Sequence, residues 1–236
     1  MKKLSVFVEG QTEQIFMEKL ISEIANKGEA SVKLMKAMYG SKEPRKIMIL
    51  KDAQLDRKYY IQIIDCGNDT SIQSDIRDNA ASLQREGFHK IIGLRDVYPH
   101  PHEQIPRLPR LAEQLLPRET DIPVKVLFSI TEMETWFLKE HSHLLKIHDS
   151  LTPGYIKNET GYDLENDNLE QDKKYHHAAG VLKQIYGLAN KSYNKKKSKV
   201  QQIVNKLDYE ILYLETVKSL VSFRDLIQEL DDLFTG

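Results

Sequence analysis

Four acidic residues follow apolar runs at points where strands are expected to end. They are Glu9, Asp96, Glu132 and Glu134. In an open α/β sheet, ligands bind at the carboxyl ends of the strands, so we expect these side chains to converge on one edge. Converging carboxylates repel one another, and a hard divalent cation such as Mg²⁺ or Mn²⁺ offsets that cost. A cation held in this way can stabilise charge on a phosphodiester and activate a water molecule.

Each acid also has a simpler explanation, because a carboxylate at the start of a helix can cap the helix or face solvent. Glu132 and Glu134 add a constraint. Residues two apart share a face on a strand but diverge on a helix. We therefore expect both to reach one cation only if the strand extends to about Glu134. If a helix begins at Glu132, we expect only one of the two to reach the cation.

The elements that must position these acids alternate between strand and helix through about the first 140 residues. Leu4, Val6 and Val8 fit a buried strand, and the helix behind it has apolar residues at helical spacing. Further strands are predicted at residues 31–38, 59–66, 90–96 and 124–130. Helices are predicted from Ile72, where Thr70–Gln73 fits a capping box, to a stop at Gly87, and over residues 108–116. Short apolar strands favour a mainly parallel sheet flanked by helices.

The second part of the chain has a different pattern. From about residue 142 no convincing strand pattern occurs, and we predict a polar loop at 152–171 and helices at 175–189 and from 199 to the end. An apolar stripe from Leu220 to Phe234 gives the last helix a face to pack. The sequence predicts an α/β domain over residues 1–141 and a helical C-terminal region over residues 142–236.

Composition narrows the class of protein. The 236 residues carry a net charge of −1, so nucleic-acid binding would need a local basic patch. The single cysteine, Cys66, cannot form an internal disulfide, which fits a reducing cytoplasm. No signal peptide, lipidation motif or membrane-spanning apolar run is visible, so we expect a cytoplasmic protein with no membrane partner.

The one local concentration of basic residues is KSYNKKKSK, with Lys173, Lys174, His176 and His177 upstream. Its lysines, interleaved with Tyr193, are predicted to contact a phosphate backbone; they are Lys191, Lys195, Lys196, Lys197 and Lys199. The alternative is a solvated connection between two helices. His100 and His102 have the spacing of a metal-binding His-x-His, but without a following Asp a surface loop or a phosphate contact is preferred.

Three short stretches resemble the Toprim fold: VEGQTE, RDVYP and EMETWFL, each after an apolar strand. The resemblance is to the Toprim-like nucleases of bacterial overcoming-lysogenization-defect (OLD-like) and abortive-infection systems. It implies a metal-dependent nuclease acting on DNA or RNA, in which Glu9, Asp96 and Glu134 are catalytic and bind Mg²⁺ or Mn²⁺, with Glu132 as a further ligand. It also implies a role in anti-phage defence, an ATPase partner protein, and tRNA or phage DNA as the target.

The chain departs from that family at one position. The family's Asp-x-Asp reads Asp96-Val97-Tyr98 here, so a tyrosine replaces the second acid. Either Glu132 or Glu103 substitutes, or one ion suffices, or the site is inactive and the protein is a non-catalytic Toprim-like interaction subunit. A nucleotide- or small-molecule-binding α/β protein is a third reading. The choice between DNA and RNA, the number of metal ions and any homo-oligomer stay open.

Overall fold

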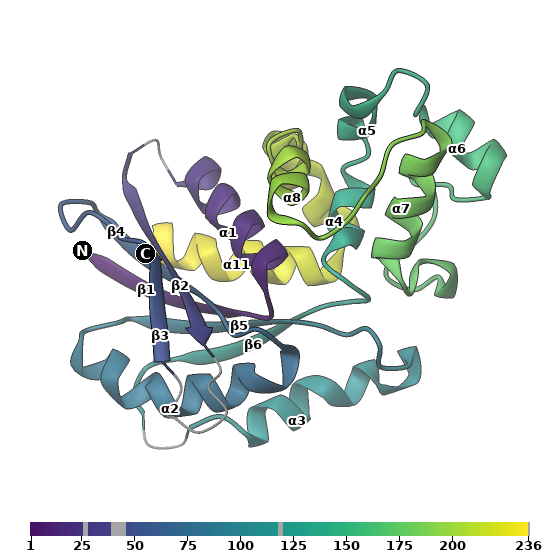
Figure 1. The fold of residues 1–236 in the computed structure, drawn as a ribbon. Coiled ribbons are helices and arrows are strands. Elements are labelled where there is room, and N and C mark those ends of the chain that lie inside the picture. The colour runs from purple at the N-terminus through teal and green to yellow at the C-terminus, as the bar shows by residue number, and fades with distance from the viewer. Residues whose placement is uncertain (26–27, 39–45, 118–119, 236) are drawn as a thin grey trace. The chain divides into compact units, whose positions relative to one another are not determined.

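A computed structural model describes residues 1–25, 28–38, 46–117 and 120–235. The chain forms two compact units (Figure 1). Unit 1 comprises Met1–Arg95, Pro106–Phe128 and Glu229–Gly236, and unit 2 comprises Asp96–Ile105 and Ser129–Gln228. The limits of these units differ from the predicted division after residue 141, because the chain enters unit 2 directly after the strand that ends at Asp96.

Unit 1 contains a six-stranded sheet in the order β3-β2-β4-β1-β5-β6. The strands are β1 (Lys2–Val8), β2 (Ala30–Met38), β3 (Lys46–Lys51), β4 (Tyr59–Asp65), β5 (Lys90–Asp96) and β6 (Val124–Ser129). β1 pairs in parallel with β4 and β5, and β2 pairs in parallel with β4. The edge strand β3 is antiparallel to β2. The sheet is therefore of the mostly parallel α/β class.

Helices cover both faces of this sheet. Helix α1 (Gln11–Ile24) packs on β2 and β4, and α2 (Ile72–Arg85) packs on β1. Figure 1 shows α1 and the end of α11 (Val221–Thr235) on one face, and α2 with α3 (Leu108–Gln114) on the other. Since β1 and β4 lie in the centre of the sheet, nearly all their side chains are buried, which explains their near-continuous apolar sequence.

Gly93 allows the close contact between β5 and α2. A Cβ atom at this position would lie 2.9 Å from Ile72 Cγ2 and from Ile76 Cδ1, and 3.3 Å from Val126 Cγ2. These three side chains belong to the packed core, so they have little room to move. A glycine in the middle of this strand therefore lets the helix approach the sheet.

The predicted strands at 31–38, 59–66, 90–96 and 124–130 are confirmed to within one residue at each end. Strand β3 was missed, and its six residues are all exposed at the edge of the sheet. The predicted capping box was wrong. Asn68 Oδ1 accepts hydrogen bonds from Ser71 N (3.0 Å) and Ser71 Oγ (2.8 Å), so Asn68 rather than Thr70 closes this turn.

Within its described residues, unit 2 has no strand beyond Asp96 and Ser129 at its boundaries, in agreement with the predicted helical region. Its helices are α4 (Glu134–Lys139), α5 (Ser142–Ile147), α6 (Pro153–Thr160), α7 (Ala178–Leu188), α8 (Lys197–Val204), α9 (Tyr209–Ile211), α10 (Val217–Ser219) and the start of α11. A short π-helix (Leu212–Thr216) joins α9 to α10. The region from residue 199 to the end, predicted to be helical, is divided into several helical segments.

The predicted loop at 152–171 was wrong over its first half, which forms α6. Thr152 Oγ1 accepts a hydrogen bond from Tyr155 N, Pro153 occupies the first turn, and Gly161 ends the helix in the left-handed conformation (φ 77°). These are the standard helix start and stop signals, so the sequence contained the information. Among the described residues, no helix is both long enough and apolar enough to cross a membrane.

Candidate metal centre

Asp96 is the last residue of β5 and is buried in unit 2. Its Oδ1 accepts a hydrogen bond from the backbone N–H of Met133 at 3.0 Å. Two backbone hydrogen bonds hold the following residues beside the segment after β6: Val97 N donates to Ser129 O at 3.0 Å, and Tyr98 N donates to Thr131 O at 2.7 Å. Asp96 is therefore fixed against the turn that carries the two glutamates.

Glu132 and Glu134 lie on either side of the start of α4. The strand before them ends at Ser129, Thr131 has a left-handed backbone (φ 75°), and α4 begins at Glu134. Neither predicted geometry is therefore correct, because the strand stops before Glu132 and the helix starts after it. Both side chains nevertheless reach the same site, since the irregular backbone of the turn frees them from the alternation of a strand.

Asp96, Glu132 and Glu134 form one cluster of buried carboxylates, called here the acid cluster. One oxygen from each lies within 4.8 Å of the others. Glu134 is fully buried, and its Oε2 has no hydrogen-bond partner among the described residues. A buried carboxylate oxygen without a partner carries a large desolvation cost. The cluster is thus missing a positively charged or hydrogen-bonding group, and three carboxylate oxygens are a donor set suited to a hard divalent cation.

A segment before α8 supplies part of the neutralising charge. Lys195 Nζ lies 3.1 Å from Glu134 Oε1 and 3.5 Å from Glu132 Oε1. Tyr193, which is buried, donates a hydrogen bond from its hydroxyl to Glu134 Oε1 at 2.5 Å. Lys195 thus supplies positive charge to the two glutamates of the acid cluster, while Glu134 Oε2 has no partner among the described residues.

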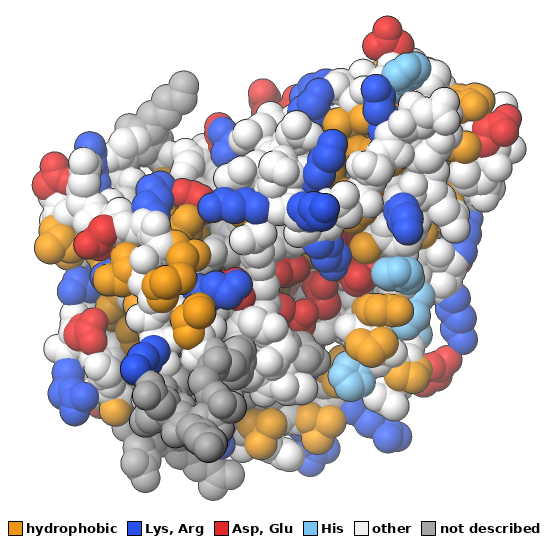
Figure 2. Space-filling model, in the orientation of Figure 1, with side chains coloured by type: hydrophobic (Ala, Val, Ile, Leu, Met, Phe, Trp, Pro, Cys, Tyr) orange, Lys and Arg blue, Asp and Glu red, His pale blue; other side chains and the backbone are white. Residues whose placement is uncertain are grey.

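The other oxygen of Glu132 is held by the start of α7. His177 Nδ1 bonds to Glu132 Oε2 at 2.8 Å, and the backbone N–H of Ala179 donates to the same oxygen at 2.9 Å. The carboxylate is therefore oriented by two donors, one of them on the backbone. Figure 2 shows histidine side chains (pale blue) beside acidic (red) and basic (blue) side chains on one face of the molecule.

The predicted site residues divide between the two units. Asp96, Glu132 and Glu134 come together in unit 2, as predicted. Glu9 lies in unit 1, in the turn between β1 and α1, where it is half-buried. Its participation in the site stays a prediction. The roles of all four residues as metal ligands also stay predictions.

The predicted basic patch is divided as well. Lys195 turns to the acid cluster, and Tyr193 is buried beside it rather than placed on a nucleic-acid-binding surface. Lys196 and Lys197 are exposed at the start of α8. Lys191 and Lys199 line a cavity of about 280 Å³ together with Lys206. The sequence predicts a phosphate contact for Lys195, which stays a prediction, but it does not indicate the position of Lys195 beside Glu132 and Glu134.

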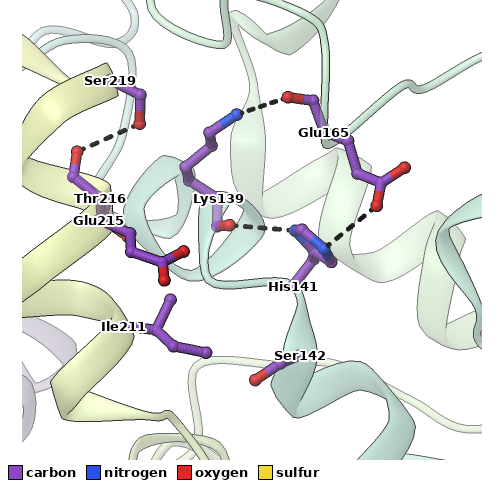
Figure 3. Close-up of a pocket in the computed structure, with 8 residues that line it drawn as sticks. All are labelled: Lys139, His141, Ser142, Glu165, Ile211, Glu215, Thr216 and Ser219. Atoms are coloured by element: carbon purple, nitrogen blue, oxygen red, sulfur yellow. Dashed lines mark hydrogen bonds and ion pairs between the residues drawn. The ribbon is translucent and has the colours of Figure 1, made fainter.

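A larger cavity of about 410 Å³ lies elsewhere in unit 2 (Figure 3). It is lined by Lys139, His141, Ser142, Glu165, Ile211, Glu215, Thr216 and Ser219. The Lys139 ammonium donates to the carbonyl oxygens of Leu164 (3.2 Å) and Glu165 (2.9 Å), and burial lowers its pKa. No member of the acid cluster lines this cavity. Sequence reasoning did not identify it, because its residues are scattered over 80 positions of the chain.

The acid cluster is therefore the part of the described structure with the clearest capacity for chemistry. Comparison of the chain with protein-family models, with curated proteins and with solved structures gives no match in any of the three. The functional assignment consequently depends on the geometry of the site and on the short motifs of the sequence.

Proposed function

We propose that this protein is a divalent-metal-dependent nuclease that hydrolyses phosphodiester bonds in DNA or RNA, on a Toprim-like α/β domain. The observation that carries the proposal is the convergence of Asp96, Glu132 and Glu134, with Glu134 Oε2 lacking a partner in the part of the chain that the structure describes. Mg²⁺ or Mn²⁺ is the cation proposed, because both prefer oxygen ligands. Following the resemblance, we further propose a cytoplasmic role in bacterial anti-phage defence, with an ATPase partner protein.

The residues of the cluster have distinct roles in this proposal. Asp96 and Glu134 hold the cation, with Glu132 as a further ligand. A divalent cation bound there would stabilise charge on the phosphate and lower the pKa of a water molecule. Glu132 is oriented by His177 and Ala179 N, so it enters the site with a fixed carboxylate. Lys195, within 3.5 Å of both glutamates, is placed to neutralise charge that develops on the phosphate.

The test is cleavage of plasmid DNA, single-stranded DNA and bulk tRNA with Mn²⁺ or Mg²⁺, together with calorimetric titration of Mn²⁺. Wild type should bind Mn²⁺ and cut at least one substrate, while Asp96→Asn should lose both properties without a change in its circular dichroism. Glu9→Gln, tested in parallel, decides whether Glu9 belongs to the site. Cutting by wild type and Asp96→Asn at equal rates would refute the assignment.

The second candidate is a non-catalytic Toprim-like interaction subunit. Tyr98 at the position of the family's second acid favours it, because the ring of Tyr98 stacks on His177 rather than offering a carboxylate. Under this alternative Lys195 is the permanent counterion of the cluster. Mn²⁺ would then fail to bind tightly to wild type, and Lys195→Met would lower stability with no gain in metal affinity.

A further inference from the structure

Four aromatic and imidazole side chains lie against one another in unit 2, called here the ring cluster: Tyr98, His102, His176 and His177. Tyr98 stacks on His177 with ring centroids 4.8 Å apart and planes at 16°. His176 contacts Tyr98 at 5.3 Å and His102 at 4.9 Å. An ion pair between Lys173 and Glu103 (2.9 Å) holds the two segments together. Two loops distant in sequence thus build one surface of rings.

The ring cluster is joined directly to the acid cluster. His177 bonds to Glu132 at 2.8 Å, and its side chain keeps 55% of its surface exposed. The imidazole lies on the backbone of α7 at Gly180, where a Cβ atom would come within 2.6 Å of His177 Cδ2. Gly180 therefore makes room for the ring in its position. The stacked rings of Tyr98 and His177, partly exposed to solvent, therefore lie beside the proposed site of phosphate cleavage.

Two nitrogens of the ring cluster have no partner among the described residues. They are His102 Nε2 and His176 Nδ1, both shielded from solvent. Burial lowers the pKa of His102, and the neighbouring His176 adds to the effect. Unpaired imidazole nitrogens can serve a hydrogen-bonding ligand or a softer metal ion such as Zn²⁺. The test below separates these two.

Cationic side chains flank the rings. Lys195 is 47% exposed beside Glu132, and Lys173 is 76% exposed. Exposed rings next to cationic side chains are the features that bind single-stranded nucleic acid, because each base stacks on a ring while the backbone meets positive charge. A base within a duplex is already stacked and paired, and extruding it costs a few kcal/mol.

We propose that the Tyr98–His177 stack binds an unpaired nucleobase next to the scissile phosphate, so that the substrate is single-stranded DNA or RNA. This inference rests on the proposed nuclease function and adds the substrate class. The stack determines which strands enter the site. The acid cluster does not discriminate between strands, because it meets only phosphate and cation.

The test uses oligonucleotides that contain 2-aminopurine, whose fluorescence is quenched when the base stacks. Binding is measured in Ca²⁺, which occupies oxygen-ligand sites. Wild type should quench the single strand and bind it at least about tenfold more tightly than the duplex. His177→Ala should bind about tenfold more weakly without quenching. His177→Phe, which keeps a ring, should retain most of the quenching. His148→Ala, an exposed histidine outside the ring cluster, should match wild type.

Gly180→Ala gives a second variant in which misfolding is not expected, since alanine is favoured over glycine within a helix. Its new methyl group should displace the imidazole and reduce quenching while thermal stability is kept.

The inference is overturned if duplex and single strand bind equally, if His177→Ala quenches as wild type does, or if 2-aminopurine mononucleotide binds as tightly as the strand. Stoichiometric Zn²⁺ binding that His102→Ala abolishes, without any quenching of the strand, also overturns it.

The calorimetric Mn²⁺ titration tests the nuclease proposal without any oligonucleotide. A failure of the nuclease proposal can therefore be distinguished from a failure of the base-stacking proposal. Normal Mn²⁺ binding with equal cleavage of duplex and single strand would refute the stacking role alone. Quenching of the single strand with no Mn²⁺ binding would refute the nuclease proposal and leave a base-binding surface.

Discussion

Buried carboxylates are neutralised in different ways in the two units. In unit 1, Glu229 near the end of α11 pairs with Lys90 through one oxygen and with Lys125 through the other. One carboxylate thus meets two ammonium groups, and both oxygens have partners. In unit 2, Lys195 pairs with both Glu132 and Glu134, and Glu134 Oε2 has no partner among the described residues.

The difference distinguishes a structural ion pair from a site prepared for a ligand. Breaking a satisfied buried ion pair costs stability, because the remaining charge is left without compensation. A carboxylate oxygen that is buried without a partner is instead unfavourable by itself, and a bound cation would offset that cost. Variants in the two regions should therefore respond differently to metal, pH and salt.

The largest expected effect is stabilisation of wild type by Mn²⁺. At a free concentration 100 times the dissociation constant, a cation that binds only the folded state adds about 2.7 kcal/mol to the free energy of unfolding. Glu134→Gln should lose this gain, because it removes the negative charge of one ligand. Thermal denaturation with and without Mn²⁺ measures the effect.

Glu229→Gln is the matched control for this experiment, since it alters a buried acid outside the cluster. It should keep the full Mn²⁺ effect whatever its own stability. An Mn²⁺ effect that disappears in Glu229→Gln but persists in Glu134→Gln would reverse the assignment of the two regions.

The next effect concerns the Glu229 ion pair in the absence of metal. Burial raises the pKa of Glu229, but hydrogen bonds from Lys125 and Lys90 outweigh it, so the pKa falls below the ordinary value of 4.5. A lowered pKa in the folded state contributes stability above pH 4.5, and this contribution is lost as the pH falls through the folded-state value. Glu229→Gln should lower the free energy of unfolding by about 1–3 kcal/mol at pH 7. This difference between wild type and Glu229→Gln, called here the gap, should shrink in acid.

Urea denaturation of both proteins at pH 7 and at pH 3 measures that gap. Asp232→Asn provides the control, because Asp232 is 64% exposed and lies 3.9 Å from Lys90. Its effect should stay within about 0.5 kcal/mol. A gap between wild type and Glu229→Gln that widens at pH 3 would contradict the proposed origin of the stability.

Replacing Lys195 should have a smaller effect, and it should raise the affinity for Mn²⁺ rather than lower it. Removing this ammonium in Lys195→Met takes away a cation that repels the incoming metal ion. A unit charge and a divalent cation about 4 Å apart in a water-like environment repel by about 2 kcal/mol, so Mn²⁺ should bind about thirtyfold more tightly. Calorimetric titration measures the change, and Lys196→Met, which alters an exposed neighbour, should leave the affinity unchanged. Weaker Mn²⁺ binding to Lys195→Met would show instead that Lys195 helps to hold the site open.

The centre of the sheet could be predicted from sequence because β1, β4 and β5 are buried over most of their length and read as apolar runs. The acids at strand ends followed from the same pattern, since a strand that ends at Asp96 fixes where its carboxylate lies. Strand β3 escaped prediction because it is an exposed edge strand with one neighbour. Its apolar residues do not alternate with polar ones, so the sequence KIMILK lacks the periodicity of a half-buried strand.

The rest of the site could not be predicted, because it depends on contacts between distant positions. His177 and Glu132 are 45 residues apart, and Tyr193 and Glu134 are 59 apart. Local periodicity places each residue on an element but does not indicate which elements meet. Lys195 was assigned to a basic patch for this reason, since five lysines close in sequence suggest one surface. The tertiary structure instead directs one of them to the acids.

The smallest effect tests what remains of that patch. Lys191 and Lys199 line one cavity, outside the acid cluster, so their contribution to nucleic-acid binding should be electrostatic alone. The double variant Lys191→Ala/Lys199→Ala should reduce the slope of log affinity against log salt by about 1.4 for a single strand, because each neutralised phosphate contributes about 0.7. Anisotropy titrations at several NaCl concentrations measure the slope, and Lys218→Ala, at an exposed lysine on α10, serves as control. An unchanged slope would assign phosphate binding to other basic residues, and within this stretch it would leave Lys195, Lys196 and Lys197 as the candidates.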